Sequence, residues 1–155
     1  MIIDFEYAKK ERQAYLSTHK EFNNINVQRD MFEVPMGHIL SLHTNLAEII
    51  NAWIDNGACN QIVLEQIVLF LSKIGELSIL LNLDLVKDIE ELQIEPIEVN
   101  FNKLFSKISK LENKKKSANK FIVINYIVPL FAELVYSLGF SLRELEEAYK
   151  EIIGG

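Results

Sequence analysis

The sequence predicts an all-α protein, a multi-helix bundle that forms a single domain over residues 1–155. Composition is one reason, because six glycines and three prolines are few for this length and a sheet-rich protein needs more turn residues. Periodicity is another, because apolar residues recur at helical spacing over long stretches. With 49% hydrophobic and 25% charged residues, the chain has the balance of a globular domain that buries its own core.

The first predicted helix runs from Asp4 to about Phe22, where the apolar residues share one loose face. Asparagines in the segment 23–26 favour a turn after it, because short amide side chains compete for backbone hydrogen bonds. Pro35 can begin the next helix, since its missing N–H costs nothing in a first turn. Apolar residues at offsets 0, 3, 7, 10, 11 and 14 define that helix, namely Ile39, Leu42, Leu46, Ile49, Ile50 and Trp53.

The segment Gln61–Leu81 is apolar nearly all the way round, which is typical of a buried helix at the centre of a bundle. A turn with Gly57 precedes it, and this glycine can adopt the left-handed conformation found at helix ends. The segment is long enough to raise the question of a membrane span. Polar side chains interrupt it and exclude that interpretation: Glu65, Gln66, Lys73 and Glu76.

Two further helices are predicted in the middle of the chain. Asp84 can cap a short helix that continues through Leu92, and Pro96 separates it from a helix over Phe101–Leu111. The three lysines at 114–116 follow. A solvated loop or helix end accounts for such a run, and steering of a phosphate group is the alternative.

The last third of the chain predicts a long apolar helix and a short amphipathic one. The first covers Phe121–Leu138, where Pro129 requires a kink or a fresh helix start. Ser141 and Glu144 then form a capping-box pattern, S-L-R-E, which begins a final helix to about Ile153.

The charge and the cysteine content limit the classes of function. With a net charge of −6 and a pI near 5.1, we expect no general attraction to nucleic acid or to an anionic membrane. Binding of a nucleotide through divalent cations is compatible with this negative charge, because the metal supplies the positive charge. Cys59 is the single cysteine and excludes an internal disulfide, and no signal peptide is visible, so we expect a cytoplasmic protein.

A polar stripe on the helix after Pro35 is the first candidate site. Within it, Asn45 and Glu48 are three residues apart and can offer two oxygens to one hard cation. Glu65 or Glu76 on the following helix could complete such a metal site if the two stripes face each other. A solvated edge of an amphipathic helix is the alternative. The stripe occupies offsets 0, 3, 7 and 10, with His38, Ser41, Asn45 and Glu48.

The string HILSLHTNLAEIINAW resembles a helix of the dimeric dUTPases. In that family two glutamates at E-x-x-E spacing hold magnesium on this helix, and an asparagine follows them. Asn45 occupies the first glutamate position, Glu48 the second, and Asn51 matches the asparagine. The resemblance therefore implies that Glu48 binds metal, with Asn45 and Asn51 in ligand-binding positions.

The string VLEQIVLFLSKIG is similar to the next helix of the same family, which brings an E-x-x-D pair to the same metals. Two registers are open. One places Glu65 and Val68 at the acidic positions, and the other places Gln66 and Leu69 there. The aspartate is missing in both, so Glu65 is the one acidic residue that this helix brings to the implied site.

The string LGFSLRELEEAYKEI resembles the end of the family pattern up to Tyr149. Ile152 and Ile153 stand where the family has lysine and asparagine. In all, the resemblance covers about residues 37–150 and points to the all-α NTP pyrophosphohydrolases, in the dimeric dUTPase branch, with MazG-like proteins as the nearest relatives.

The family implies a homodimer that uses Mg²⁺ to hydrolyse dUTP or another dNTP to the monophosphate and pyrophosphate. Glu48 and Glu65 would be its catalytic and metal-binding residues, helped by Asn45 and by Glu76. With two of the expected carboxylates missing, binding of magnesium should be poor. Two readings follow: a pyrophosphohydrolase with weak or lost activity, or a non-catalytic dimeric binding or regulatory protein with the same fold. An unrelated helical bundle is a third.

Other chemistry has less support in the sequence. His43 lies away from the polar stripe, and no serine or cysteine stands at a recognisable spacing from a histidine, so nucleophilic catalysis is not expected. Cys59 lies beside a turn and is not expected to act as a nucleophile. Trp53 ends an apolar stripe and is expected in the core or an interface, with stacking on a base as the alternative.

Overall fold

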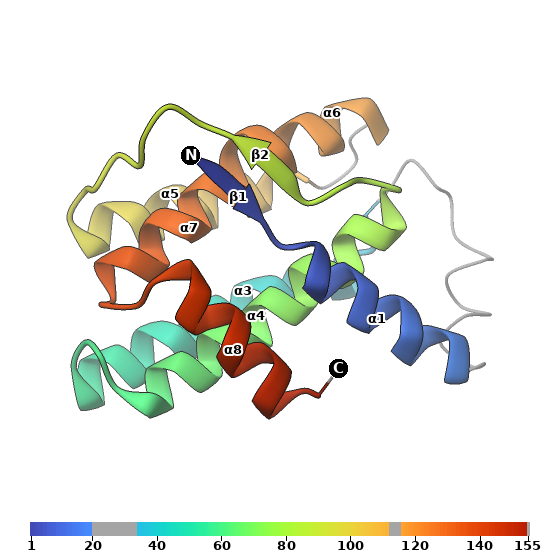
Figure 1. Ribbon diagram of the computed structural model, residues 1–155. Helices are drawn as coiled ribbons and strands as arrows, with labels where there is room; N and C mark the ends of the chain where they lie inside the picture. Colours follow the sequence, from blue (N-terminus) through green and yellow to red (C-terminus); the bar gives the residue numbers. More distant parts are fainter. Residues whose placement is uncertain (20–33, 112–115, 155) are drawn as a thin grey trace.

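A computed structural model describes residues 1–19, 34–111 and 116–154 (Figure 1). Helices dominate the described chain and confirm the all-α prediction; a two-stranded sheet is added to them. In chain order the elements are β1 (Ile2–Asp4), α1 (Glu6–Thr18), α3 (Met36–Asn56), α4 (Gln61–Leu80), β2 (Val86–Asp88), α5 (Ile97–Ser109), α6 (Lys116–Ile122), the π-helical segment η1 (Val123–Ile127), α7 (Val128–Ser137) and α8 (Leu142–Ile152).

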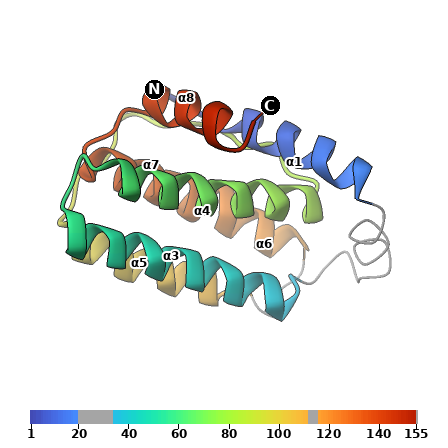
Figure 2. The ribbon, with the colours of Figure 1, turned by 90° about the horizontal axis from the view of Figure 1, so that it is seen from below.

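Helices α3 and α4 form an antiparallel hairpin, with bounds close to those predicted (Figure 2). Gly57 at the end of α3 has φ +80°, which matches its predicted role in the turn. The side chain of Asn60 then caps α4 by accepting a hydrogen bond from the Ile62 N–H at 2.8 Å. These local signals make the short connection between the helices.

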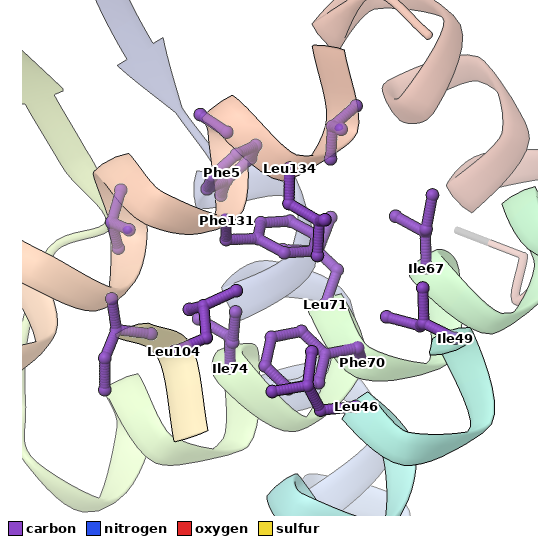
Figure 3. Packing of buried hydrophobic residues seen from close by; sticks show 14 of the residues in the cluster. Phe5, Leu46, Ile49, Ile67, Phe70, Leu71, Ile74, Leu104, Phe131 and Leu134 are labelled. Atoms are coloured by element: carbon purple, nitrogen blue, oxygen red, sulfur yellow. The ribbon is translucent and has the colours of Figure 1, made fainter. Parts of the chain in front are cut away.

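The core lies around α4, which contacts α3, α1 and α8. Phe70 of α4 packs against Phe131 of α7 with ring centroids 5.3 Å apart, and Phe5 contacts the other side of Phe131 at 5.5 Å (Figure 3). Burial of each large apolar side chain contributes about 1.5–3 kcal/mol. The predicted role of α4 as the buried central helix is therefore confirmed.

The predicted capping box at the start of α8 is confirmed. Ser141 Oγ accepts a hydrogen bond from the Glu144 N–H at 3.1 Å, and Glu144 Oε1 accepts one from the Ser141 N–H at 3.1 Å. Each side chain satisfies a backbone donor that the helix leaves free. This reciprocal pair fixes where α8 begins.

The predicted apolar helix over Phe121–Leu138 consists of α6, η1 and α7, and it begins earlier, at Lys116. Pro129 cannot donate a backbone hydrogen bond, and the widened π-helical turn precedes it directly. Within the described ranges, the continuous helix Lys116–Ser137 is long and apolar enough to cross a membrane by length and composition. Half of its most apolar window is buried inside the bundle, as in an ordinary core helix.

The helix predicted between Asp84 and Leu92 is wrong. This segment forms β2, which pairs antiparallel with β1 in the register Ile3↔Lys87. The Phe5 N–H donates to the Leu85 carbonyl at 2.9 Å, so hydrogen bonds to a strand 80 residues away replace those of a helix. Asp84 caps no helix; its carboxylate lies 3.3 Å from Lys9 Nζ.

The predicted bounds of two other helices also change. Asp4 belongs to β1, so the first helix begins at Glu6. The helix predicted from Phe101 begins four residues earlier, at Ile97, directly after Pro96. The first helix ends at Thr18, four residues before the predicted end near Phe22. Two predictions lie wholly or partly outside the described residues: the turn at 23–26 and Lys114–Lys115 of the lysine run.

Candidate functional site

The predicted site residues lie on the outer faces of the α3–α4 hairpin. Glu48 and Asn51 are exposed on α3, and Asn45 is half-buried. Glu65 is exposed on the first half of α4. Among the described residues neither Glu48 nor Glu65 has a hydrogen-bond or ion-pair partner, so both carboxylates face water.

Glu48 and Glu65 lie at a similar level along the hairpin. His38 Nε2 lies 3.1 Å from the Lys73 carbonyl oxygen, which fixes the level of the two antiparallel helices there. Glu48 follows His38 by about 15 Å along α3, and Glu65 lies about 12 Å from Lys73 in the same direction. The two residues are therefore at a similar level along the hairpin, and both side chains are at the surface.

Neither register of the second acidic motif gains a carboxylate. Val68 is fully buried in the core, at 0% exposure, so its position cannot face solvent or a metal ion. Leu69 is 42% exposed and lies one turn after Glu65 on the same face. Both registers therefore stay open as predictions. The position of the family's aspartate is held by Val68 in the first register and by Leu69 in the second, so neither supplies a carboxylate there.

Glu76 lies in a different environment, although it is on the same helix. Its side chain is 7% exposed, and basic side chains from α1, α3 and α4 itself lie around it. Arg12 Nη1 of α1 lies 3.3 Å from Oε1, Lys73 Nζ lies 3.5 Å from Oε2, and His38 Nδ1 of α3 lies 4.0 Å from Oε2. This carboxylate is neutralised within the fold.

The ion pairs of Glu76 extend through α1 to α8. Arg12 forms two hydrogen bonds to Glu11, of which Nε to Oε1 measures 2.6 Å. Tyr149 of α8 donates its hydroxyl to the same Glu11 oxygen at 2.6 Å. We call the set Glu11, Arg12, Lys73, Glu76 and Tyr149 the buried charge network.

The environment of this network keeps Arg12 protonated and Tyr149 neutral. The hydrogen bonds from Arg12 to Glu11 raise the pKa of the guanidinium further, so Arg12 stays cationic. Burial, and then the hydrogen bond to Glu11, raise the pKa of Tyr149, so its hydroxyl stays a neutral donor. The network is thus built for permanent ion pairing between helices.

A close approach of α1 to α4 holds the network in place. A Cβ atom added to Gly75 would lie 2.9 Å from the Ala8 carbonyl oxygen and 3.1 Å from the side chain of Arg12. Glycine at this position lets the two backbones touch, which brings Arg12 over Glu76.

The described residues do not fit the pair of magnesium ions that the resemblance implies. Among residues 1–19, 34–111 and 116–154, no group of three or more His, Cys, Asp or Glu side chains could hold a metal ion. The oxygen donors of Glu48, Glu65 and Asn45 carry two negative charges, and Mg²⁺ gives up its hydration shell reluctantly. The carboxylate of Glu76 already faces Arg12 and Lys73.

The structure pairs a serine with a histidine that the sequence did not connect. Ser109 Oγ of α5 lies 3.3 Å from His43 Nε2 of α3, and the His43 ring stacks on Phe105 with centroids 5.5 Å apart. Ser109 donates its one proton to the Phe105 carbonyl at 2.9 Å, so His43 is the donor to Ser109. This arrangement does not activate the serine as a nucleophile. Burial lowers the pKa of His43, which favours the neutral ring.

The other residues singled out from the sequence have structural roles. Trp53 packs against Phe101 with ring centroids 6.2 Å apart, as expected for the core. Cys59 is exposed in the α3–α4 turn, where its N–H donates to the Leu138 carbonyl at 2.9 Å. The buried charge network was the feature that sequence reasoning missed. Its signal was Glu76 in an otherwise apolar helix, but nothing local identifies Arg12 as its partner.

Comparison with known proteins identifies no family for this chain: no family model, no curated protein and no solved structure matches it.

Proposed function

We propose that this protein is a non-catalytic binding or regulatory protein, built on a helical bundle that resembles the dimeric dUTPases. One observation carries the proposal: Glu76, the acid that could join Glu48 and Glu65, is committed to Arg12 and Lys73. The Glu76 side chain is 7% exposed, and separating a buried carboxylate from a cation it pairs with is costly. The proposal thus assigns Glu76 to stability rather than to metal binding.

The chemistry of hydrolysis supports the same conclusion. Attack of water on a nucleoside triphosphate in the resembling family depends on metal ions that polarise the phosphate and lower the pKa of the water. Glu48 and Glu65 supply two charges at an exposed surface, where water competes strongly for the cation.

A hydrolysis assay tests this proposal. The protein is incubated with dUTP and with each of the common dNTPs, in Mg²⁺ or in Mn²⁺, and pyrophosphate release is measured. We expect no release above a protein-free control, with Glu48→Ala identical to the wild type. Turnover that is lost in Glu48→Ala and retained in Glu147→Ala, an exposed acid on α8, would overturn the proposal.

A nucleotide pyrophosphohydrolase for dUTP or another dNTP is the second candidate function. The observation in its favour is the common level of Glu48 and Glu65 along the hairpin, which follows from the contact of His38 with the Lys73 carbonyl. The same assay separates the candidates, because this one requires metal-dependent turnover that Glu65→Ala also removes.

A homodimer belongs to both candidates, because the resembling family is dimeric. Two exposed apolar side chains on α4, Ile62 at 48% and Leu69 at 42%, flank Glu65 and support an interface on this face. Sedimentation velocity of the wild type should then give a dimer, and Leu69→Lys should give a monomer. A monomeric wild type at micromolar concentration would remove the dimer from both candidates.

A further inference from the structure

One end of the described bundle carries a surface where lysines and aromatic rings meet. Lys107 and Lys110 come from the end of α5, and three residues come from α6, which lies at the edge of the bundle (Figure 2). Tyr126 of η1 completes it. We call this set the basic-aromatic surface; its members are Lys107, Lys110, Lys116, Lys120, Phe121 and Tyr126.

The charge of the chain is distributed very unevenly along the sequence. Seven of the 16 Lys and Arg residues fall within residues 101–121, together with one of the 22 Asp and Glu residues. This stretch carries a net charge of +6, whereas the whole chain carries −6. The overall acidity therefore hides a local basic region, and an expectation drawn from net charge alone does not apply to it.

Direct contacts join three members of the surface, Lys107, Phe121 and Tyr126. Lys107 Nζ lies 3.7 Å from the centre of the Tyr126 ring, in a cation–π contact between α5 and η1. Phe121 meets Tyr126 edge to face, with ring centroids 5.9 Å apart. Lys116 and Lys120 are one helical turn apart on α6, so they project from the same side. Lys107, Tyr126 and Phe121 thus form one contact cluster, and Lys110, Lys116 and Lys120 are close to it in the sequence at the end of α5 and on α6.

The lysines of the patch have no acidic partners within the described residues. In those ranges lysine ion pairs involve Lys9, Lys73, Lys103 and Lys150, none of which belongs to the patch. Desolvation and the charge of neighbouring Lys110 lower the pKa of Lys107, as expected where like charges meet without compensation. As far as the described residues go, the positive charge of this surface is uncompensated and complementary to an anion.

Phe121 adds an apolar element that a free phosphate would not use. Its side chain is 57% exposed. An aromatic ring among lysines is suited to the boundary between lipid headgroups and acyl chains, where the ring enters the apolar layer and the ammonium groups contact phosphates. Single-stranded nucleic acid would use free ring faces for successive bases, but Lys107 covers a face of Tyr126.

We propose that the basic-aromatic surface docks this protein reversibly on an anionic phospholipid membrane, with Phe121 inserted at the headgroup level and the four lysines bound to lipid phosphates. The acidic remainder of the chain then faces away from the membrane, which orients the molecule. This function is separate from the hairpin site of Glu48 and Glu65 and does not depend on it.

Co-sedimentation with lipid vesicles tests the proposal. One set of vesicles contains phosphatidylcholine alone, and the other contains equal parts of phosphatidylcholine and phosphatidylglycerol. We expect the wild type to pellet with the anionic vesicles and to be released by high salt. The double change Lys116→Gln with Lys120→Gln should weaken partitioning about 25-fold, because each lysine near an anionic surface contributes about five-fold.

Phe121→Ser should weaken binding to the anionic vesicles about ten-fold and leave its salt dependence unchanged, because the lost contribution is apolar. Matched control variants remove two cations or one apolar side chain outside the basic-aromatic surface. Lys10→Gln with Arg143→Gln removes two exposed cations outside the patch, and Ile54→Ser removes an apolar side chain that is 68% exposed on α3. Circular dichroism confirms that each variant is folded.

Three outcomes would overturn the proposal. Equal binding to both kinds of vesicle, or no binding to either, excludes recognition of anionic lipid. Equal losses in the patch variants and their controls exclude this surface. Tighter binding to a fluorescent oligothymidine than to the anionic vesicles, with loss in the same patch variants, assigns the surface to single-stranded nucleic acid instead.

Discussion

The two halves of α4 carry the same kind of residue in opposite environments. Glu65 and Glu76 are eleven residues apart, about three helical turns, so they project along one line of the helix. Glu65 faces water, whereas Glu76 is buried beneath α1 with Arg12. The difference lies in the neighbouring helix: α1 packs over the second half of α4, where Arg12 meets Glu76, and does not reach Glu65 (Figure 2).

This contrast shows why a line of acidic residues in a sequence is an ambiguous signal. A carboxylate with an open coordination face can serve a metal, but one enclosed by cations serves packing. The approach of α1 that Gly75 permits makes the distinction in this protein. The following predictions test that contrast.

Arg12→Met should have the largest effect. It removes the guanidinium between Glu11 and Glu76, whose side chains are 13% and 7% exposed, and leaves two acids in a buried place. We expect the free energy of unfolding to fall by about 3–5 kcal/mol. Urea denaturation followed by circular dichroism measures it.

The control for this change is Arg143→Met, which removes an exposed cation that pairs with Glu147 at 3.3 Å. It should change stability by about 1 kcal/mol or less. Equal losses of unfolding free energy in Arg12→Met and Arg143→Met would contradict the contrast, because they would show that a buried ion pair contributes no more than an exposed one.

Gly75→Ala should have the next largest effect. The added methyl group meets the Ala8 carbonyl at 2.9 Å, and backbone atoms cannot move aside cheaply, so α1 must shift. We expect a loss of about 1–3 kcal/mol in thermal or urea unfolding. Gly37→Ala on α3 meets nothing within 4 Å and should be neutral or stabilising by about 0.5–1 kcal/mol.

Glu133→Gln should change how stability depends on pH. Glu133 of α7 is buried, and among the described residues no cation pairs with it as Arg12 pairs with Glu76; desolvation raises its pKa above the usual 4.5. The folded state therefore holds this proton more tightly than the unfolded state. Stability from this group is complete below about pH 4.5 and is lost as the pH rises through the higher folded pKa.

The measurement for Glu133 is the free energy of unfolding at intervals between pH 4 and pH 7. The wild type should lose stability over the lower part of this range relative to Glu133→Gln, which has no such proton. Exposed Glu147→Gln serves as the control and should follow the wild type. Parallel curves for the wild type and Glu133→Gln would refute the assignment.

Glu65→Ala should have the smallest effect on stability. Its carboxylate has no partner among the described residues, so removal should change the free energy of unfolding by about 0.5 kcal/mol or less. A loss comparable with that of Arg12→Met would place Glu65 in a network of its own and would erase the contrast between the two halves of α4.

Local signals in the sequence predict much of the fold. The capping box of Ser141 and Glu144, the turn at Gly57 and the apolar length of α4 depend on neighbours within a few residues, and all three are confirmed. The strand over Val86–Asp88 was mistaken for a helix because its hydrogen-bond partners lie in β1, at the other end of the sequence. Pairing at that distance leaves little trace in a local pattern.

The candidate site was predictable to a smaller extent. The helices that carry Glu48 and Glu65 follow from periodicity, whereas the common level of these residues depends on the contact of His38 with the Lys73 carbonyl, which periodicity does not predict. The fate of Glu76 depends on Arg12, 64 residues earlier, and on a backbone contact at Gly75. Spacing along one helix cannot reveal which acid a second helix will cover.

Metal titration shows whether the acids of α3 and α4 hold a divalent cation. We propose that they do not, because Glu76 is committed to Arg12 and because Glu48 and Glu65 are too few. Calorimetric titration of the wild type with MnCl₂ should therefore give no saturable heat. Stoichiometric binding that disappears in Glu48→Ala and in Glu65→Ala would contradict the account and restore a metal-dependent hydrolase as the function of this protein.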